Sequence, residues 1–222
     1  GVGIGAAMVG LRPIIEFMTW NFSFVAFDQI ISNAAKVHQM SAGAIRVPIV
    51  FRGPNGAAKQ VASQHSHSAA PFYTNIPGLY VIQPSTPRDA KGLMAAALAS
   101  DDPCVFIEPV AQYFERQEGV PVEHYEIPIG KARLAREGAD ATIVAYGNAV
   151  GIAEQAAEAL ESEGVSVDIV DLRTLKPWDE SAVIDSVTKT GRLVVVDVGG
   201  TSTAFANAVS ERLHFPPLAR HK

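Results

Sequence analysis

Residues 47–68 read VPIVFRGPNGAAKQVASQHSHS and bring together an apolar run, a glycine-rich loop and two histidines. The β-branched run at 47–51 predicts a strand covered on both faces, as in a parallel sheet. The turn residues at 52–56 follow at the carboxyl end of that strand. Because ligands of open α/β sheets bind outside the carboxyl ends of the strands, we expect the chemistry of this protein here.

His65 and His67 stand on the serine-rich segment after this loop. A loop histidine is usually a solvated or hydrogen-bonded side chain, and this is the simplest interpretation of both. A His-x-His pair can also supply two metal ligands, but a site needs three or four, and no Cys or carboxylate lies at matching spacing. The other alternative is a group that donates or accepts a proton near neutral pH.

The rest of the chain alternates between strand and helix patterns, which predicts an α/β fold with two parallel sheets. A polar, acidic stretch at 109–126 without a clean period predicts a connection between two domains, 1–125 and 126–222. The expected strands are 13–18, 47–51, 79–82, 104–107, 141–146, 166–172 and 192–198. The expected helices are one that closes at Gly10, an amphipathic one at 23–40, and those at 87–99, 149–162 and 180–189.

Composition excludes several classes of protein. With 48% hydrophobic and 18% charged residues, the chain is typical of a globular protein, and its net charge of −5 without a basic run disfavours nucleic-acid binding. The single cysteine, Cys104, lies in the apolar run CVFI and is interpreted as a core thiol. No apolar run approaches membrane-spanning length and no signal peptide is recognised, so we expect no membrane partner.

A series of longer phrases then points to one family: GLRPIIEFMTWNFSFVAFDQI, VPIVFRGPNGA, QHSHS, IPGLYVIQP, DAKGL, IPIGKA, DLRTLKPWD and SVTKTGRLVVV, in this order. The chain resembles the beta subunits of the thiamine-diphosphate-dependent 2-oxo-acid dehydrogenases, most closely the pyruvate-specific ones. The resemblance implies a pyrimidine-binding domain of the transketolase type over 1–125 and an incomplete transketolase C-terminal domain over 126–222.

The resemblance also implies a reaction and site residues. The family decarboxylates a 2-oxo acid oxidatively with thiamine diphosphate and passes the acyl group to the lipoyl group of a transacetylase. His65 matches the family's active-site histidine, expected to stabilise charge or transfer a proton during reductive acylation. Phe22 matches the aromatic residue that packs against the aminopyrimidine ring, and Met18 is expected beside that ring.

The resemblance further implies partners and ions. The cofactor's diphosphate and Mg²⁺ lie on a separate alpha subunit in this family, which predicts an alpha-two beta-two heterotetramer within a multienzyme complex. A potassium ion held mainly by backbone carbonyls is expected at Ile49, Ala97, Ser100 and Asp102. Either a bacterial cytoplasm or the matrix of an organelle would fit.

Some alternatives stay open. The stretch IEP at 107–109 is similar to the branched-chain relatives, and acetoin-cleaving or transketolase-type enzymes use the same cofactor. The family's cofactor-activating glutamate corresponds to a position upstream of Gly1, and its closing segment is not matched, so we expect a chain truncated at both ends. A non-catalytic scaffold is therefore the remaining alternative.

Overall fold

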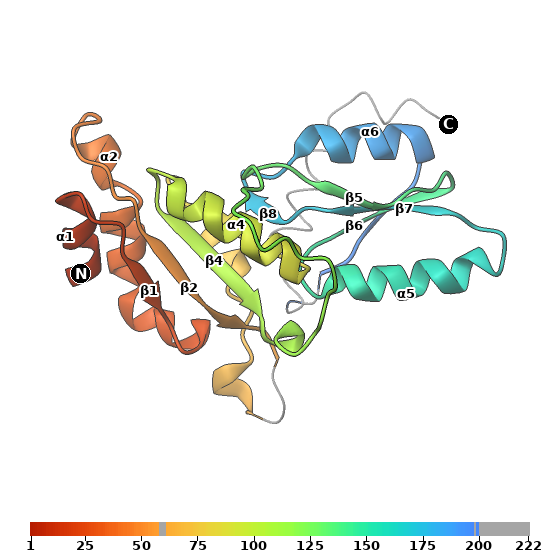
Figure 1. Ribbon diagram of the computed structural model, residues 1–222, viewed down its shortest axis with the longest axis horizontal. Coiled ribbons are helices and arrows are strands. Elements are labelled where there is room, and N and C mark those ends of the chain that lie inside the picture. The colour runs from red at the N-terminus through yellow and green to blue at the C-terminus, as the bar shows by residue number, and fades with distance from the viewer. Residues whose placement is uncertain (58–60, 198, 200–222) are drawn as a thin grey trace.

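The computed structural model describes residues 1–57, 61–197 and 199, which form two β-sheets flanked by helices (Figure 1). The elements of the first half are α1 (Val2–Met8), β1 (Ile14–Glu16), η1 (Trp20–Ala26), η2 (Gln29–Ala34), α2 (Val37–Met40), β2 (Val50–Asn55), η3 (Ser63–His65), α3 (Ala70–Thr74), β3 (Tyr80–Ile82), α4 (Pro87–Ala99), β4 (Cys104–Pro109) and η4 (Val110–Gln112). Those of the second half are β5 (Arg133–Arg136), β6 (Ala141–Ala145), α5 (Ala149–Glu161), β7 (Val167–Asp171), β8 (Thr174–Lys176), α6 (Glu180–Thr190) and β9 (Leu193–Val195).

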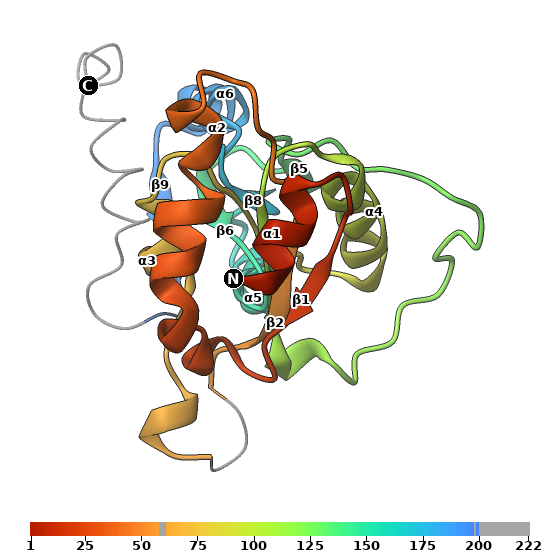
Figure 2. The same cartoon turned by 90° about the vertical axis from the view of Figure 1, so that its left-hand side faces the viewer.

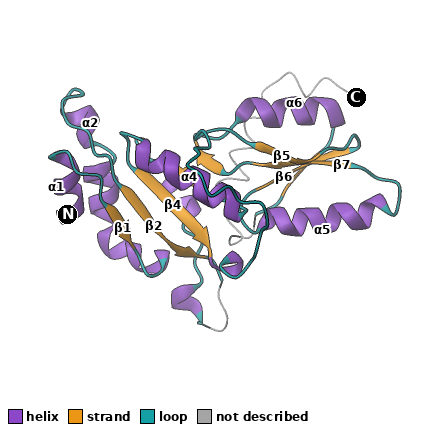
Figure 3. Ribbon diagram, in the orientation of Figure 1, coloured by secondary structure: helices purple, strands orange, loops and turns teal. Residues whose placement is uncertain are grey.

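The first sheet has the strand order β1-β2-β4-β3-β8, and its strands β2 and β4 are largely buried. β4 agrees with the strand predicted over 104–107, whereas β2 begins at Val50, three residues later than the strand predicted over 47–51, and continues through the predicted turn to Asn55. Parallel pairing of Arg52, Gly53 and Pro54 with β4 holds these turn-type residues in the sheet. Alternate residues of these strands face different helices, as strand geometry requires. Phe51 and Val105 belong to a core with Ile30 and Tyr73, whereas Cys104 and Phe106 belong to a core with α4. The sheet therefore lies between α4 and a layer made of η2 and α3. Figure 3 shows α4 beside β4.

The second sheet has the order β5-β7-β6-β9, and α5 and α6 lie on its opposite faces (Figure 1). Both sheets are mainly parallel, which confirms the predicted fold class. Two antiparallel strands, β5 and β8, were not predicted from the sequence. They are short and carry polar residues, so they lack the apolar runs that identify the central strands.

Residues 20–40, here called the aromatic arm, correct one expectation. The sequence predicts a single α-helix over 23–40, whereas the structure has the 3₁₀ helix η1, the π-helical turn η2 and the short helix α2 over residues 20–40. Ser23 Oγ donates to Trp20 O at 2.7 Å, a local bond that competes with α-helical pairing. Ala35 N–H donates to Ile30 O at 3.0 Å, the i to i−5 bond of a π turn.

A cluster of buried charges joins the two halves of the chain. The carboxylate of Asp171, which is fully buried, accepts hydrogen bonds from Ser85 Oγ and, at 3.0 Å, from Arg133 Nη2. Asp89, at the start of α4, accepts one from Arg173 Nη1 at 3.1 Å. Burial raises the pKa of Asp171 despite these partners. The cluster fixes the end of β7 against the start of α4.

Gly53 lies within β2, in a segment for which the sequence predicts a turn at 52–56, and it permits a close approach of two backbone segments. A Cβ added at Gly53 would lie 2.2 Å from Phe17 O. We therefore expect Gly53→Ala to lower the free energy of unfolding by about 1–3 kcal/mol, because the strand would have to shift. Urea unfolding followed by circular dichroism measures this.

The matched control is Gly5→Ala, in the exposed face of α1, where an added Cβ meets nothing within 4 Å. Alanine is the better helix former by roughly 0.5–1 kcal/mol, so this variant should be at least as stable as the wild type. Equal stability of the two alanine variants would contradict the close-approach argument.

The carboxylate of Asp168, beneath α6, makes the free energy of unfolding depend on pH. It accepts hydrogen bonds from Lys189 Nζ at 2.7 Å, Ser186 Oγ at 2.6 Å and Gly138 N–H at 2.8 Å. Burial acts to raise its pKa, but these hydrogen bonds outweigh burial and the pKa is lowered. A lowered pKa means that the ionised carboxylate stabilises the fold above the unfolded-state value of about 3.9, and that this stabilisation is lost as the pH falls through the folded-state value.

Asp168→Asn should therefore lower the free energy of unfolding at pH 7 and flatten its decline below about pH 4. Urea unfolding at a series of pH values measures both effects. Asp185→Asn, on the exposed side of the same helix, serves as the control and should leave the curve close to that of the wild type. A parallel decline in Asp168→Asn and wild type would show that this carboxylate does not contribute.

Candidate functional site

The three residues predicted for catalysis and cofactor binding, Met18, Phe22 and His65, lie beyond the carboxyl edge of the first sheet. β1 and β2 run parallel, and each continues into a segment that carries site residues: the arm after β1, and residues 61–68, here called the histidine loop, after β2. Phe17 N–H donates to Arg52 O at 2.8 Å, which extends the pairing of the two strands toward that edge. The candidate site residues therefore lie beyond the carboxyl ends of parallel strands, the edge at which open α/β sheets bind ligands.

Phe22 and His65 lie against each other. Their ring centroids are 5.1 Å apart with planes at 79°, an edge-to-face contact between the arm and the histidine loop. Phe22 is 46% exposed, so much of its ring remains open for a ligand. Met18, four residues earlier, is 80% exposed. The structure thus brings two of the three residues into contact and leaves apolar surface beside them.

The Nδ1 atom of His65 is buried and has no hydrogen-bond partner among the described residues. A buried, unpaired ring nitrogen costs free energy unless a ligand or a second chain supplies its partner. A cofactor that fits this site has to contact the exposed part of the Phe22 ring and give His65 Nδ1 a hydrogen-bond partner. An aromatic heterocycle with hydrogen-bonding groups, such as an aminopyrimidine, fits both features.

Asn21 links the arm to the histidine loop and was missed as a site residue by the sequence reasoning. Its Oδ1 atom accepts hydrogen bonds from His67 N–H at 2.9 Å and from His67 Nδ1 at 2.7 Å. Phe24 contacts the His67 ring at 6.0 Å between centroids. No local sequence signal identifies this contact, because its partners are 46 residues apart.

A second group missed from the sequence surrounds Arg52 at the ends of β1, β2 and β4. Its guanidinium donates to both carboxylate oxygens of Glu108, at 2.5 and 2.7 Å, and to Glu16 at 2.7 Å. Tyr113 also donates to Glu108, at 2.6 Å. The hydrogen bond with Glu108 is the main cause of the raised pKa of Arg52. This group ties together the three strand ends that carry the site.

A polar cavity of about 120 Å³ lies between the carboxyl ends of β2, β3 and β6. Asn55, Gln83, Tyr146 and Asp197 are among its lining residues. Burial, followed by the charge of Asp197, raises the pKa of Tyr146. The cavity adjoins the histidine loop through Ser66, which also lines it.

The four residues expected to hold a monovalent cation lie at the opposite, amino-terminal edge of the sheet. Cys104 N–H donates to Ile49 O at 2.9 Å, and Cys104 Sγ lies 3.8 Å from Ala97 O and 3.5 Å from Asp102 O. Three of the carbonyls are therefore brought together around Cys104, and such oxygens suit a hard cation. The described residues contain no cluster of three or more His, Cys, Asp or Glu side chains suited to a metal ion.

The fourth carbonyl already has a cationic neighbour. Arg12 Nη1 donates to Ser100 O at 2.7 Å, and Arg12 also pairs with Asp101 at 2.6 Å. Ser100 Oγ donates to Asp102 O at 3.2 Å, which keeps the turn compact. Cys104 is buried, and burial raises the pKa of its thiol to about 12. The core-thiol interpretation of this cysteine is confirmed.

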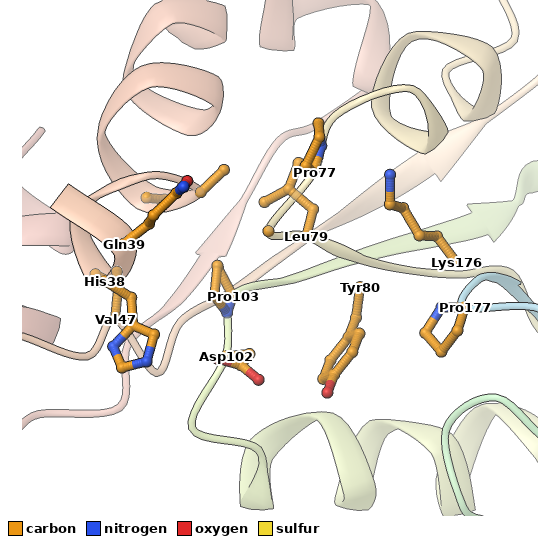
Figure 4. Close-up of a pocket in the computed structure, with 13 residues that line it drawn as sticks. His38, Gln39, Val47, Pro77, Leu79, Tyr80, Asp102, Pro103, Lys176 and Pro177 are labelled. Carbon is orange, nitrogen blue, oxygen red and sulfur yellow. The ribbon is translucent and has the colours of Figure 1, made fainter. Parts of the chain in front are cut away.

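A larger cavity of about 400 Å³ adjoins the same edge, with Pro77, Leu79, Tyr80, Asp102 and Lys176 among its lining residues (Figure 4). Figure 4 shows the amine of Lys176 and the hydroxyl of Tyr80 pointing in different directions. Burial and then Asp102 raise the pKa of Tyr80, whereas burial and then Lys36 lower that of Lys176. Neither Phe22 nor His65 lines this cavity, so we do not assign it as the cofactor site although it is larger than the polar cavity.

Two family models match the sequence of the chain, and a solved structure matches its fold. The transketolase pyrimidine-binding domain family matches residues 1–115, and the transketolase C-terminal domain family matches residues 130–218. A solved split gene transketolase, described as an inactive beta4 tetramer, is similar with a TM-score of 0.79 and 23% identity, over 97% of this chain and 68% of that chain. At this identity, the likeness concerns the fold alone.

Curated relatives are similar over most of the chain. Pyruvate dehydrogenase E1 component subunit beta of Rhizobium meliloti (strain 1021) is 49% identical over 213 residues, which cover 96% of this chain and 46% of the relative. Pyruvate dehydrogenase E1 component subunit beta-1, mitochondrial, of Arabidopsis thaliana is 49% identical over 202 residues, which cover 90% and 56%. The chain spans about half the length of these relatives. The resemblance found in the sequence is confirmed.

Proposed function

The chain belongs to the transketolase-like family that joins a pyrimidine-binding domain to a transketolase C-terminal domain, and we propose that it acts as the beta subunit of a thiamine-diphosphate-dependent pyruvate dehydrogenase. The observation that carries the proposal is the contact of His65 with the half-open ring of Phe22 at the carboxyl edge of the first sheet. The relatives named above support the choice of pyruvate.

Each site residue has a distinct role in this proposal. Thiamine diphosphate, when bound, supplies the chemistry that breaks the bond between the keto carbon and the carboxylate of the substrate. Phe22, which is 46% exposed, would pack against the aminopyrimidine, and Met18, which is 80% exposed, would lie beside that ring. His65 holds or moves the proton needed when the acyl group passes to a lipoyl group. The buried Nδ1 of His65 acquires a hydrogen-bond partner in the assembled site.

An alpha subunit completes the site in this proposal by holding the diphosphate and Mg²⁺. Large apolar side chains are exposed in or next to α1 and the arm: Val2, Val9, Met18, Phe22, Val25 and Met40. α1 and η2 lie side by side (Figure 2). Large apolar side chains left exposed on neighbouring elements are typical of a protein interface. We expect it to be covered in an alpha-two beta-two heterotetramer, which then delivers the acyl group to the lipoyl transacetylase.

Potassium at the amino-terminal edge is part of the same proposal. The carbonyls of Ile49, Ala97 and Asp102 surround Cys104, and the oxygen of Ile49, which accepts the Cys104 N–H, keeps a second lone pair for a cation. The oxygen of Asp102 already accepts from Ser100 Oγ and Cys104 Sγ, so a cation would replace one of these weak bonds. Such an ion would brace the turn between α4 and β4, far along the strands from His65. Its role would therefore be structural.

The chain is proposed to divide into domains 1–125 and 126–222, and to act in a bacterial cytoplasm or an organelle matrix. Among the described residues, no helix is long and apolar enough to cross a membrane. The boundary falls in the long connection between η4 and β5.

Reconstitution with an alpha subunit tests the function directly. The complex should decarboxylate pyruvate in the presence of thiamine diphosphate and Mg²⁺ and acetylate a lipoyl domain. His65→Ala should lower kcat for lipoyl acetylation by about 10²-fold or more, because a proton-transferring group is lost. Steady-state kinetics with purified lipoyl domain measure this.

His124→Ala is the matched control, since His124 is exposed and pairs only with Glu126 among the described residues. It should leave kcat unchanged. A complex that forms but prefers branched-chain 2-oxo acids or acetoin would select the corresponding alternative. A complex that forms without turning over any of these substrates would support the scaffold alternative.

Thermal unfolding tests the potassium site. K⁺ should raise Tm relative to Na⁺ or choline at equal ionic strength, by about 2–4 °C for each kcal/mol of binding free energy. Ser100→Asp adds a carboxylate at the site and should increase the K⁺-specific shift, whereas Ser162→Asp, on an exposed residue at the end of α5, should not. Equal Tm values in all three salts would overturn the assignment.

A further inference from the structure

The buried carboxamide of Asn21 connects the two segments that form the candidate site. Asn21 is 7% exposed and lies in η1, directly before Phe22. Its Nδ2 atom donates to Thr19 Oγ1 at 2.7 Å, and its Oδ1 atom accepts both bonds from His67. Asn21 is therefore adjacent in sequence to Phe22, and His67 is two residues after His65. The rings of Phe22 and His65 are the two that are in contact in the candidate site.

These hydrogen bonds determine which way the Asn21 amide is turned and which ring nitrogen of His67 carries a proton. The backbone N–H of His67 can only donate, so the atom that faces it at 2.9 Å must be the oxygen of Asn21. That oxygen can only accept, so Nδ1 of His67, at 2.7 Å, carries a proton. In the neutral ring, Nε2 is then the basic nitrogen, and the bond to Asn21 persists when the ring is protonated.

The histidine loop has few other attachments to the arm. Two edge contacts between rings, Phe22 with His65 and Phe24 with His67, run beside the Asn21 bonds. Such ring contacts contribute about 0.5–1.5 kcal/mol each and tolerate sliding. Two hydrogen bonds to one buried oxygen have a narrow geometry, so they determine where the loop stands.

We infer that Asn21 is a positioning residue: it docks the histidine loop onto the arm through His67 and thereby sets the position of the His65 imidazole against Phe22. The catalytic meaning of this inference rests on the proposed function. The mechanical part, the docking of residues 61–68 by one carboxamide, does not depend on it.

Two substitutions separate docking from folding. Asn21→Leu keeps the size of the side chain and removes both bonds to His67. Asn21→Asp keeps an oxygen that accepts both bonds, and Thr19 Oγ1 can donate to the carboxylate in place of accepting. Asn33→Leu is the matched control on the same arm, because among the described residues the Asn33 side chain bonds only to Gln29, one helical turn earlier.

Hydrogen exchange read by mass spectrometry tests docking in the complex with the alpha subunit. Asn21→Leu should speed exchange in the peptide that covers 61–69, because the His67 N–H loses its acceptor, while peptides from β2 and β4 keep their protection. Asn21→Asp and Asn33→Leu should match the wild type. Unchanged exchange of 61–69 in Asn21→Leu would overturn the inference.

Steady-state kinetics distinguish a loss of His65 positioning from general structural damage. With Asn21→Leu, lipoyl acetylation should fall by about 10²-fold with little change in KM for pyruvate, since a misplaced group costs that order of rate. Decarboxylation measured with an artificial electron acceptor, which bypasses the lipoyl group, should fall less. Asn21→Asp should restore acetylation to within a few-fold of the wild type. An equal fall in both half-reactions without rescue by Asn21→Asp would contradict positioning through His65.

The two proposals fail in different ways. If the wild-type complex does not act on pyruvate, the proposed function fails, and the exchange experiment still decides whether Asn21 docks the loop. If the wild-type complex is active and Asn21→Leu acetylates lipoyl groups as fast as the wild type, the function stands and the inference about Asn21 fails.

Discussion

The buried carboxylate of Asp171 is the constraint on which the relation between the two halves depends. A fully buried charge is tolerated only when it is paired and hydrogen-bonded, and Ser85 and Arg133 supply these partners from different parts of the chain. Asp89 and Arg173 form a second pair beside it. Such clusters contribute little net stability compared with apolar residues, but they penalise every other arrangement of the segments that carry them. They therefore determine how α4, β5 and β7 meet.

Buried contacts within the first half of the chain determine the position of the candidate site. The arm is held by Trp20, by Ser23 and by Tyr73 of α3, whose hydroxyl lies 2.6 Å from Ser23 Oγ and whose pKa burial raises to about 12. The histidine loop is closed by Ala69 N–H, which donates to Asn55 Oδ1 at 2.8 Å. Both segments are thus attached to buried residues on either side of the exposed rings. A preorganised site of this kind costs little reorganisation when a ligand binds.

The sequence predicted those parts of the fold that apolar periodicity determines. The central strands and α4, α5 and α6 follow from β-branched runs and helical spacing, and the family resemblance identified Phe22 and His65, which the structure places in contact. The division of the arm into 3₁₀, π and α segments was not predicted. An amphipathic pattern shows which face of a helix is buried, but not whether each backbone N–H bonds to the carbonyl of residue i−3, i−4 or i−5. Asn21 was missed because a buried amide that bonds across 46 residues has no local pattern.

The strand β8 has a consequence for any attempt to separate the two halves. It comes from the second half of the chain, yet it pairs antiparallel with β3 and completes the edge of the first sheet. A chain cut in the connection after η4 would leave the outer edge of β3 with unpaired N–H and C=O groups beside the apolar residues Val81 and Ile82. An open edge of this kind is a template for pairing with other chains. The carboxyl-terminal half therefore protects the amino-terminal half from self-association, in addition to any share it has in binding a cofactor.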